Sequence, residues 1–307
     1  MEEEHVVGKP VSCDPDRTDI ETLESMLRDE RGQTRKNALD AVLRIGKSEP
    51  DRVTPLADTI VDRLDDSFLV AQITAADAVS TLATRQPDAV SHGRVQLLSL
   101  LDEDPPLLRS RAARAISHLV DADPVQFVEH SERFFDILRK GPTVETGTES
   151  LLTGDEPSLE EQKAARQLRR NRGQALSNDK QRSVYVRRVA AESLGSVAQV
   201  DPESCSRQVS DCVNLFKDEQ ARVRGEAVDV VRHVAEWNSG AVGEAIDPLT
   251  NRLDDEAEFV RARAIRALGF AEATQTVPQL EATAAAESAD SVAELAATTA
   301  EWLENRA

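Results

Sequence analysis

The feature that most constrains the fold is a period of 37 residues that recurs along the chain. One set of positions marks where helix-like apolar runs begin: Thr34, Ala71, Leu108, Val186, Val223 and Val260, separated by 37, 37, 78, 37 and 37 residues. A second set consists of prolines: Pro50, Pro87, Pro124 and Pro202, separated by 37, 37 and 78 residues. Because the two sets are independent, their agreement indicates one repeating unit with a single interruption.

Each repeat carries the pattern of two amphipathic helices. The clearest copy lies between Leu253 and Gly269, where an acidic turn precedes Val260-Arg261 and apolar residues follow at helical spacing. The last apolar residue of each first helix comes fourteen residues after the repeat proline: Leu64, Leu101, Leu138 and Phe216. A short helical hairpin buries its apolar stripe only against neighbouring hairpins. We therefore expect an all-α fold, an α-solenoid of about seven hairpins, with Ala264 and Leu268 buried.

The composition agrees with this packing and limits the class of protein. Hydrophobic residues make up 40% of the chain but aromatic residues only 3%, so the core must consist of Ala, Val, Leu and Ile. The net charge is -19, and the 37 cations are 30 Arg and 7 Lys. An acidic chain with so few lysines resembles the cytoplasmic proteins of salt-adapted, halophilic organisms; an ordinary acidic protein more often has Lys and Arg in similar numbers.

Neither a secretory signal nor a membrane helix is expected. The first residues, MEEEH, lack the basic flank and apolar run of a signal peptide. Apolar runs stay well short of the ~20 residues that a membrane helix needs. We expect a cytoplasmic protein with no membrane insertion.

The interruption of the repeat predicts an insertion. The gap of 78 residues is one period plus 41, and Pro124 keeps its normal distance to Leu138, so the extra residues follow Leu138 and precede Val186. This places an insertion at about 140–183 inside the fourth hairpin. Its first part, to Gly154, has a flexible composition. A capping box in the run SLEE then begins a helix that we expect Gly173 to end.

The remaining segments complete the expected domain organisation. Residues 1–18 are charged and without periodicity, and are expected to be a disordered N-terminal tail. Residues 19–307 are expected to form a single solenoid. Its C-terminal cap, at about 276–305, has a first helix that begins near Pro278, and an Ala-rich last helix with four apolar residues: Val292, Leu295, Ala296 and Trp302.

The repeats resemble HEAT repeats, in particular the short HEAT-like class of phycobilisome lyases. The resemblance covers roughly residues 19–305 without the insertion. It rests on a turn acid followed by an apolar-Arg pair: Asp254/Asp255 with Val260-Arg261, Asp218 with Val223-Arg224, Asp102 with Leu108-Arg109, and Asp29 with Thr34-Arg35. It implies that such Arg and Asp residues bond between adjacent turns. The second repeat departs from the pattern, with Ala71-Gln72 in place of an apolar-Arg pair.

HEAT-like proteins include enzymes, and the sequence was compared with each kind. Deoxyhypusine hydroxylases hold iron with His-Glu dipeptides, whereas none of the five histidines here precedes Glu. HEAT-like DNA glycosylases need a basic groove with aromatic platforms, and this chain has one Tyr and two Trp. Nothing marks a bilin-lyase chromophore site, a nucleotide-binding loop or a hydrolase nucleophile. Cys13, Cys205 and Cys212 form no paired framework, and Cys205 and Cys212 are expected to be structural thiols. We expect no catalytic residue, no cofactor and no metal.

The insertion carries a concentration of positive charge that suggests a binding site. Residues 159–188 contain nine cations and three acids, a local charge of +6. Arg166, Arg169 and Arg170 share one helix face. The candidate partner-binding residues are Lys163, Arg166, Arg169, Arg170, Arg172 and Arg182. The segment either binds a partner protein, lies on the chain's own acidic surface, or binds nucleic acid.

Salt dependence favours a protein partner over nucleic acid. A site with about six phosphate contacts would lose on the order of 10⁷ in affinity between about 0.1 M and 2 M salt. Bidentate contacts between Arg and carboxylates survive salt better because they are short and directional.

The expected function is that of a non-enzymatic protein-protein interaction adaptor. In repeat type, length and acidity the chain resembles the HEAT-repeat taxis proteins of halophilic archaea. That resemblance implies chemotaxis proteins and accessory proteins of the archaeal flagellum (archaellum) as partners. The alternatives are a HEAT-like enzyme, either a lyase or a nucleic-acid-modifying enzyme, and a general assembly scaffold.

Overall fold

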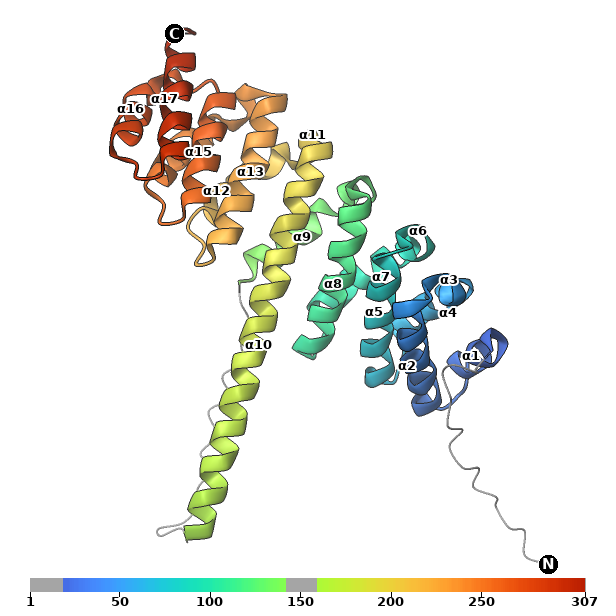
Figure 1. Ribbon diagram of the computed structural model, residues 1–307. Helices are drawn as coiled ribbons and strands as arrows, with labels where there is room; N and C mark the ends of the chain where they lie inside the picture. Colours follow the sequence, from blue (N-terminus) through green and yellow to red (C-terminus); the bar gives the residue numbers. More distant parts are fainter. Residues whose placement is uncertain (1–18, 142–158, 307) are drawn as a thin grey trace, which may run out of the picture. The chain divides into compact units, whose positions relative to one another are not determined.

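The computed structural model describes residues 19–141 and 159–306, and the side chains of these residues except 159–172. The expected N-terminal tail and the first part of the insertion lie outside the described residues. Within the described ranges the chain forms α-helices and 3-10 helices and no strand. The fold is the all-α solenoid that the repeat predicts (Figure 1).

Contacts divide the chain into two compact units. The first comprises Met1–Leu100 with Arg114–Leu119, and the second comprises Leu101–Ala113 with Val120–Ala307. Helix α8 (Pro106–Ala122) contributes residues to both.

The second helices of the hairpins follow the repeat register closely. They are α2 (Gly32–Ser48), α5 (Leu69–Ala83), α8, α10 (Leu159–Val200), α13 (Ala221–Trp237), α15 (Glu258–Phe270) and α17 (Asp290–Glu304). All of the expected helix openings except Val186 lie two residues inside the observed helix start. The 37-residue register is therefore confirmed.

The first helices are less regular than the sequence suggests. Apart from α1 (Ile20–Leu27), each includes 3-10 turns. In the first unit they are α3 (Pro50–Val53), η1 (Thr54–Leu56), α4 (Ala57–Asp62) and η2 (Arg63–Asp65), then α6 (Pro87–Val90), η3 (Ser91–Gly93) and α7 (Arg94–Ser99), and η4 (Leu100–Asp102) contributes residues to both units. In the second unit they are η5 (Pro124–His130), α9 (Ser131–Arg139), α11 (Pro202–Cys205), η6 (Ser206–Gln208), α12 (Val209–Leu215), η7 (Ser239–Ala245), α14 (Ile246–Thr250), η8 (Asn251–Asp254), η9 (Thr274–Thr276) and α16 (Val277–Ala286). Each repeat proline begins its element, where its missing amide hydrogen breaks no helical hydrogen bond.

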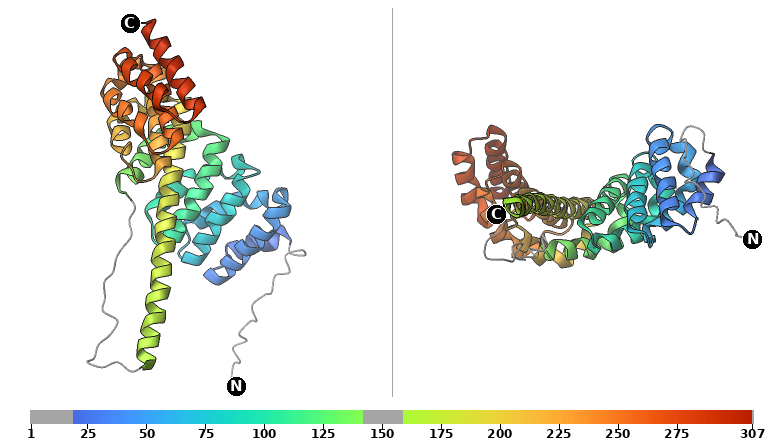
Figure 2. Two further views of the ribbon diagram at one scale, coloured as in Figure 1. Left: turned by 60° about the vertical axis from the view of Figure 1, so that its left-hand side comes forward. Right: turned by 90° about the horizontal axis from the view of Figure 1, so that it is seen from below.

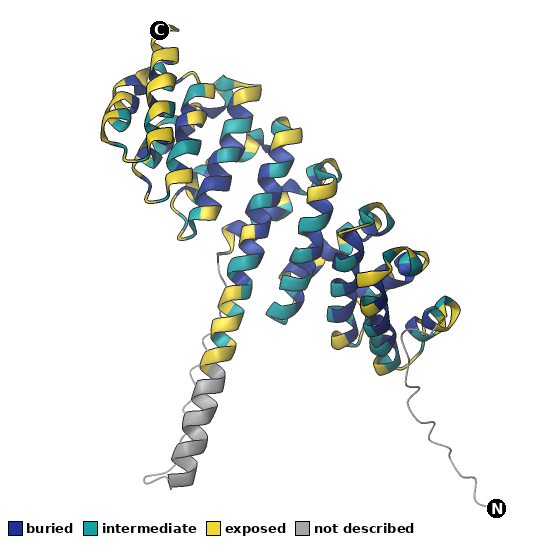
Figure 3. Ribbon diagram, in the orientation of Figure 1, coloured by how far each residue is buried: buried dark blue, intermediate teal, exposed yellow. Residues whose placement is uncertain are grey.

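Helix-on-helix packing builds the core of each unit. In the first unit α2 packs against α1, α3 and α5, and in the second α13 lies between α10 and α15 while α17 packs on α15 and α16. Figure 3 shows the buried residues along the sides of the helices that face their neighbours. Ala264 and Leu268 are 0% exposed, which confirms the predicted core positions.

The last hairpin matches the expected cap only in part. Val292 and Ala296 are buried in α17, but Leu295 is half-buried and Trp302 is 40% exposed. The Trp302 ring instead lies 4.1 Å from the guanidinium carbon of Arg306. This stacking covers one face of the exposed ring without burying it.

The helix end predicted at Gly173 is wrong. Helix α10 runs unbroken for 42 residues, so Gly173 and Val186 both lie within it. An exposed helix interior tolerates one Gly at about 1 kcal/mol, and no side chain lies within 4 Å of a Cβ built there. The α-helical part of the insertion is thus continuous with the second helix of the fourth hairpin, and it projects from the hairpins of its own unit (Figures 1 and 2).

Candidate interaction site

Buried Arg–Asp pairs connect consecutive hairpins and are called the ladder here. The candidate interaction site lies next to one of these pairs. Arg224 donates from Nε and Nη2 to the two carboxylate oxygens of Asp255, both at 2.8 Å, and from Nη1 to the carbonyl of Asp218 at 2.8 Å. In the first unit Arg35 pairs with Asp66 in the same way, at 2.6 and 2.5 Å. Each Arg reaches an acid 31 residues ahead, in the next turn, which confirms the bonding implied by the HEAT-repeat resemblance.

Three repeats depart from this pair. Arg261 bonds instead to Glu287, 26 residues ahead, at 2.6 and 2.8 Å. The other two lack the pair for reasons visible in the sequence. Gln72 cannot form an ion pair and donates instead to the carbonyl of Leu64. Arg109 has Lys140 at the position 31 residues ahead, and its Nη1 lies 3.4 Å from Asp104. The departure predicted for the second repeat is confirmed, and the one after Arg109 was missed.

The Arg187–Asp218 pair of the fourth hairpin has a different geometry. Its Nη1 and Nη2 face the carboxylate end-on, at 3.2 and 2.6 Å, and Nη2 also donates to the Leu138 carbonyl at 3.1 Å. The buried Nε has no hydrogen-bond partner among the described residues. In the regular pairs the Arg bonds to a turn carbonyl six residues earlier, but Gln181 occupies that position here and is part of α10.

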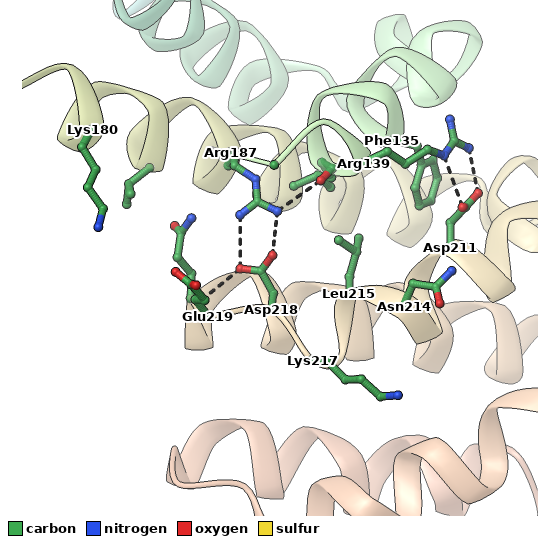
Figure 4. Close-up of a pocket in the computed structure, with 14 residues that line it drawn as sticks. Phe135, Arg139, Lys180, Arg187, Asp211, Asn214, Leu215, Lys217, Asp218 and Glu219 are labelled. Carbon is green, nitrogen blue, oxygen red and sulfur yellow. Dashed lines mark hydrogen bonds and ion pairs between the residues drawn. The ribbon is translucent and has the colours of Figure 1, made fainter. Parts of the chain in front are cut away.

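A pocket of about 520 Å³ opens beside this irregular pair (Figure 4). It lies between the end of α9, residues 180–187 of α10, and the turn from α12 to α13. Gly141, with a left-handed φ of 68°, follows α9 at the edge of the pocket. Phe135 and Leu138 are buried beneath it, while Val184 and Leu215 are half-buried in its wall.

The pocket is lined by four cations and three carboxylates. Arg139 is fully engaged: it bonds to both oxygens of Asp211, at 3.2 and 2.7 Å, and to Glu132 and Asp136, each at 2.8 Å. The hydrogen bonds that Arg139 donates to Asp211 and Glu132 raise its pKa. This cluster fixes the α9 side of the pocket to α12.

Two lysines at the pocket are free of such contacts. Lys180 comes from α10, Lys217 from the turn after α12, and both are exposed. Within residues 19–141 and 173–306 neither has a hydrogen-bond or ion-pair partner. Of the lining carboxylates, Asp211 and Asp218 are paired and Glu219 is exposed. The lining thus combines two exposed lysines with ion pairs in which Arg139 also bonds to Glu132 and Asp136.

The candidate residues from the sequence lie on α10, and all but Arg182 precede the residues of that helix that line the pocket. Lys163, Arg166, Arg169, Arg170 and Arg172 belong to its N-terminal part, where the helix is described but the side chains are not. Arg182 is half-buried and forms an ion pair with Asp179 at 2.8 Å. Most residues from Gly173 to Gln181 are exposed, so this part of α10 is presented to solvent.

The pocket itself was missed by sequence reasoning, although two signals were present. Lys180 and Lys217 are 37 residues apart, one repeat period, in a chain with only seven lysines. Gln181 also stands where the other ladder arginines have a turn acid six residues earlier. Together these signals indicate that the turn of the fourth hairpin lacks the acid that the other repeats have there.

The cysteines and the acidic residues of the described chain offer no nucleophilic or metal site. The thiols of Cys205 and Cys212 are buried, and burial raises the pKa of Cys205 to about 11. Among the described residues no group of three or more His, Cys, Asp or Glu side chains is placed to hold a metal ion. Over the same residues, every helix is too short or too polar to span a membrane.

Comparisons with known proteins agree with the repeat architecture. Residues 213–301 match the family model of HEAT repeats. No curated protein is significantly similar to the chain in sequence. The fold has the character of a HEAT-like repeat protein.

Three solved structures with a similar fold are engineered or computationally designed proteins. One engineered protein is 18% identical with a TM-score of 0.63, covering 93% of this chain and 68% of its own. A second is 19% identical with a TM-score of 0.56, covering 83% and 97%. A computationally designed armadillo repeat protein for modular peptide recognition is 16% identical with a TM-score of 0.58, covering 82% and 99%. At these identities the likeness concerns the fold alone.

Proposed function

We propose that this protein is a non-enzymatic interaction adaptor, and that it binds partner proteins through the projecting part of α10 and the pocket at its base. The observation that carries the proposal is the 42-residue length of α10. Among the side chains of α10 that the structure describes, from Gly173 onward, the first buried one is Ser183, and the helix before that residue is about 35 Å long. A polar helix of this kind gains stability when it bridges to another molecule.

Charge supports a protein partner with an acidic surface. Residues 159–188 carry +6 in a chain of -19. A long nucleic acid would be repelled by the rest of the chain and would lose affinity steeply with salt. Short contacts between Arg and carboxylates are directional and less sensitive to salt. Peptide recognition by the designed armadillo protein is a further precedent for this class of solenoid.

A more specific proposal concerns the source organism and the cellular process. The excess of Arg over Lys and the net charge of -19 support a halophilic source with a salt-rich cytoplasm. Repeat type, length and acidity together support a role in taxis, in which the adaptor links chemotaxis proteins to archaellum accessory proteins. A general assembly scaffold is the alternative that uses the same surface. A HEAT-like enzyme is less supported because its catalytic motifs are absent from the sequence.

Isolation of partners from source cells tests this proposal. A tagged chain and its Arg166→Glu/Arg169→Glu/Arg170→Glu variant would be isolated at the salt concentration of the cells, and bound proteins quantified by mass spectrometry. The control is Arg44→Glu/Lys47→Glu/Arg85→Glu, which makes the same charge change at exposed sites of the first unit. We expect the first variant alone to lose its partners, among them chemotaxis and archaellum accessory proteins. Equal recovery of partner proteins with all three chains would contradict the adaptor site. A set of partners without taxis proteins would contradict the proposed role in taxis.

A further inference from the structure

The second helices of the last two hairpins enclose an apolar groove. Helices α15 and α17 pack against each other, and a groove of about 700 Å³ lies along their solvent-facing side. Its lining includes the buried Val292 and the half-buried Ala262 and Leu295. Phe259, which is 39% exposed, lines it as well. This volume is within the range of roughly 300–1,000 Å³ that is usual for ligand sites.

Phe259 is held in place although it is exposed. Its ring lies over Gly225 of α13, where an added Cβ would come within 2.6 Å of the ring atom Cε2. The guanidinium carbon of Arg263 lies 5.6 Å from the ring centre, and this guanidinium pairs with Glu226 at 3.1 Å and with Asp229 at 2.9 Å. An aromatic ring that is already fixed loses little conformational entropy when a partner binds. Such rings often contribute much of the affinity of an interface.

Exposed aromatic side chains are concentrated in this part of the chain. The sequence has 7 Phe, 2 Trp and 1 Tyr, and the structure exposes four of these residues: Trp237, Phe259, Phe270 and Trp302. Three of the four lie on α15 or α17, the helices that form the groove. Single apolar residues are normal on a surface, but aromatic residues gathered beside an apolar groove are typical of interaction sites.

The charge of the last hairpin selects the kind of partner. Residues 267–305 contain seven acids and no Lys, Arg or His. Four carboxylates of α17 form no ion pair with any described residue: Asp290, Glu294, Glu301 and Glu304. Glu258 and Glu294 line the groove near the starts of the two helices, and the one lining cation, Arg266, lies about two turns further along α15. This charge repels nucleic acids and anionic lipids and attracts a basic segment.

We propose that the groove between α15 and α17 is a second binding site, which takes a segment of a partner protein with large apolar side chains and a basic residue. The apolar side chains fill the groove against Phe259 and Leu295, and the basic residue lies near Glu258 and Glu294. None of the lining residues belongs to α10, so this site goes beyond the proposed function and does not depend on it. An adaptor with these two sites can hold an acidic partner at α10 and a basic one at the groove.

The test uses the full chain and an array of peptides of about fifteen residues that vary independently in net charge and apolar content. The strongest binders are then labelled and titrated by fluorescence anisotropy. We expect them to be basic and apolar, and to bind Phe259→Ala about tenfold more weakly or worse. The matched control is Trp237→Ala, which should bind like the wild type because this exposed aromatic residue does not line the groove.

A charge-reversal variant tests the acidic side of the groove. Glu258→Lys/Glu294→Lys should also weaken binding about tenfold, and because both residues are exposed the fold should be unaffected. If Phe259→Ala lowers the melting temperature, this second variant decides. Its control is Glu203→Lys/Glu244→Lys, which makes the same charge change at exposed sites outside the groove and should bind like the wild type.

Three results would overturn the inference: no saturable binding of basic apolar peptides, unchanged binding by the charge-reversal variant, or a preference for acidic peptides. Self-association that is lost in Phe259→Ala, without any peptide binding, would assign the groove to a second copy of the chain and also overturn it. The Arg166→Glu/Arg169→Glu/Arg170→Glu variant separates this site from the one on α10. It should bind the peptides like the wild type, whatever its effect on cellular partners, and loss of peptide binding in it would contradict a separate site.

Discussion

Arg224 and Asp255 form two parallel hydrogen bonds of 2.8 Å, with side chains only 7% and 2% exposed. This pair joins α13 to the turn before α15, so its geometry is part of the packing between hairpins. The Arg187–Asp218 pair repeats the relationship at the insertion with the guanidinium turned end-on. The irregular pair and the open pocket beside it have the same cause: the fourth hairpin lacks the short turn that joins the two helices in the other repeats.

Removing Arg224 should destabilise the second unit strongly. Arg224→Leu leaves the Asp255 carboxylate buried, with Arg252 at 3.1 Å as its remaining cation. We expect a loss of about 3 kcal/mol in the free energy of unfolding, measured by urea denaturation. Arg85→Leu, at an exposed site, should change it by less than about 0.5 kcal/mol. Recovery of part of the loss by adding Asp255→Asn would identify the unpaired charge as the cause, and a loss below about 1 kcal/mol would contradict the pair's structural role.

Acid should weaken the ladder over a defined range. The hydrogen bond from Arg261 lowers the pKa of Glu287 from 4.5 to about 2. At Asp255 burial acts to raise the pKa, but hydrogen bonds from Arg224 and the Ala257 amide outweigh it and lower the pKa overall. A carboxylate with a lowered folded-state pKa stabilises the fold above its unfolded pKa, and that contribution disappears as the pH falls through the folded pKa.

The free energy of unfolding should therefore decrease as the pH falls from about 4.5 to about 2. Glu287→Gln should make this decrease shallower, because it removes one of the responsible groups. Urea denaturation at a series of pH values measures the effect. A variant whose pH dependence equals that of the wild type would show that Glu287 is not coupled to folding.

Two glycines should respond in opposite ways to the same substitution. A Cβ at Gly32 would lie 2.5 Å from Cβ of Phe68, which can move away only with its backbone. Gly173, in the exposed part of α10, has no such neighbour. We expect Gly32→Ala to destabilise the first unit and Gly173→Ala to strengthen α10 by about 0.5–1 kcal/mol. Gly173→Pro should break the helix there, seen as faster amide hydrogen exchange around it; exchange like that of the wild type would contradict a continuous α10.

The core register can be tested at Leu268. Its side chain is 0% exposed in α15. Leu268→Ala should cost about 2–5 kcal/mol through the cavity it leaves, and Leu268→Asp more, because the carboxylate would have no partner there. Phe270→Ala is a suitable control, since Phe270 is 41% exposed on the same helix. Equal melting temperatures for the Leu268 and Phe270 variants would show that the register is wrong.

The sequence was most informative where a residue's role repeats. The period placed the second helices within two residues, because each repeat must bury the same positions against the same neighbours. The Arg–Asp links followed from the resemblance to HEAT repeats. Asp66, the partner of Arg35, was overlooked because its own repeat lacks the apolar-Arg pair.

The insertion was harder to predict because local and longer-range preferences compete there. Gly173 suggested a helix end by its local preference, but α10 continues into a segment that is anchored from Ser183 onward by packing. The pocket is lined by side chains from different hairpins, which come together only after the hairpins stack. The changed residue at Gln181 was visible in the sequence, whereas the pocket beside Arg187 required the structure.

The most direct test of the central claim, that the insertion binds partners while the hairpins provide the scaffold, is deletion of residues 143–181. The deletion keeps the buried part of α10 and shortens the connection after α9 toward that of the other repeats. Loop closure contributes little at such lengths, so the melting temperature should change by only a few degrees, about 4 °C or less. Partner recovery from source cells, measured on the folded variant, should fall to background. A deletion that unfolds the protein, or one that folds and recovers every partner, would contradict the claim.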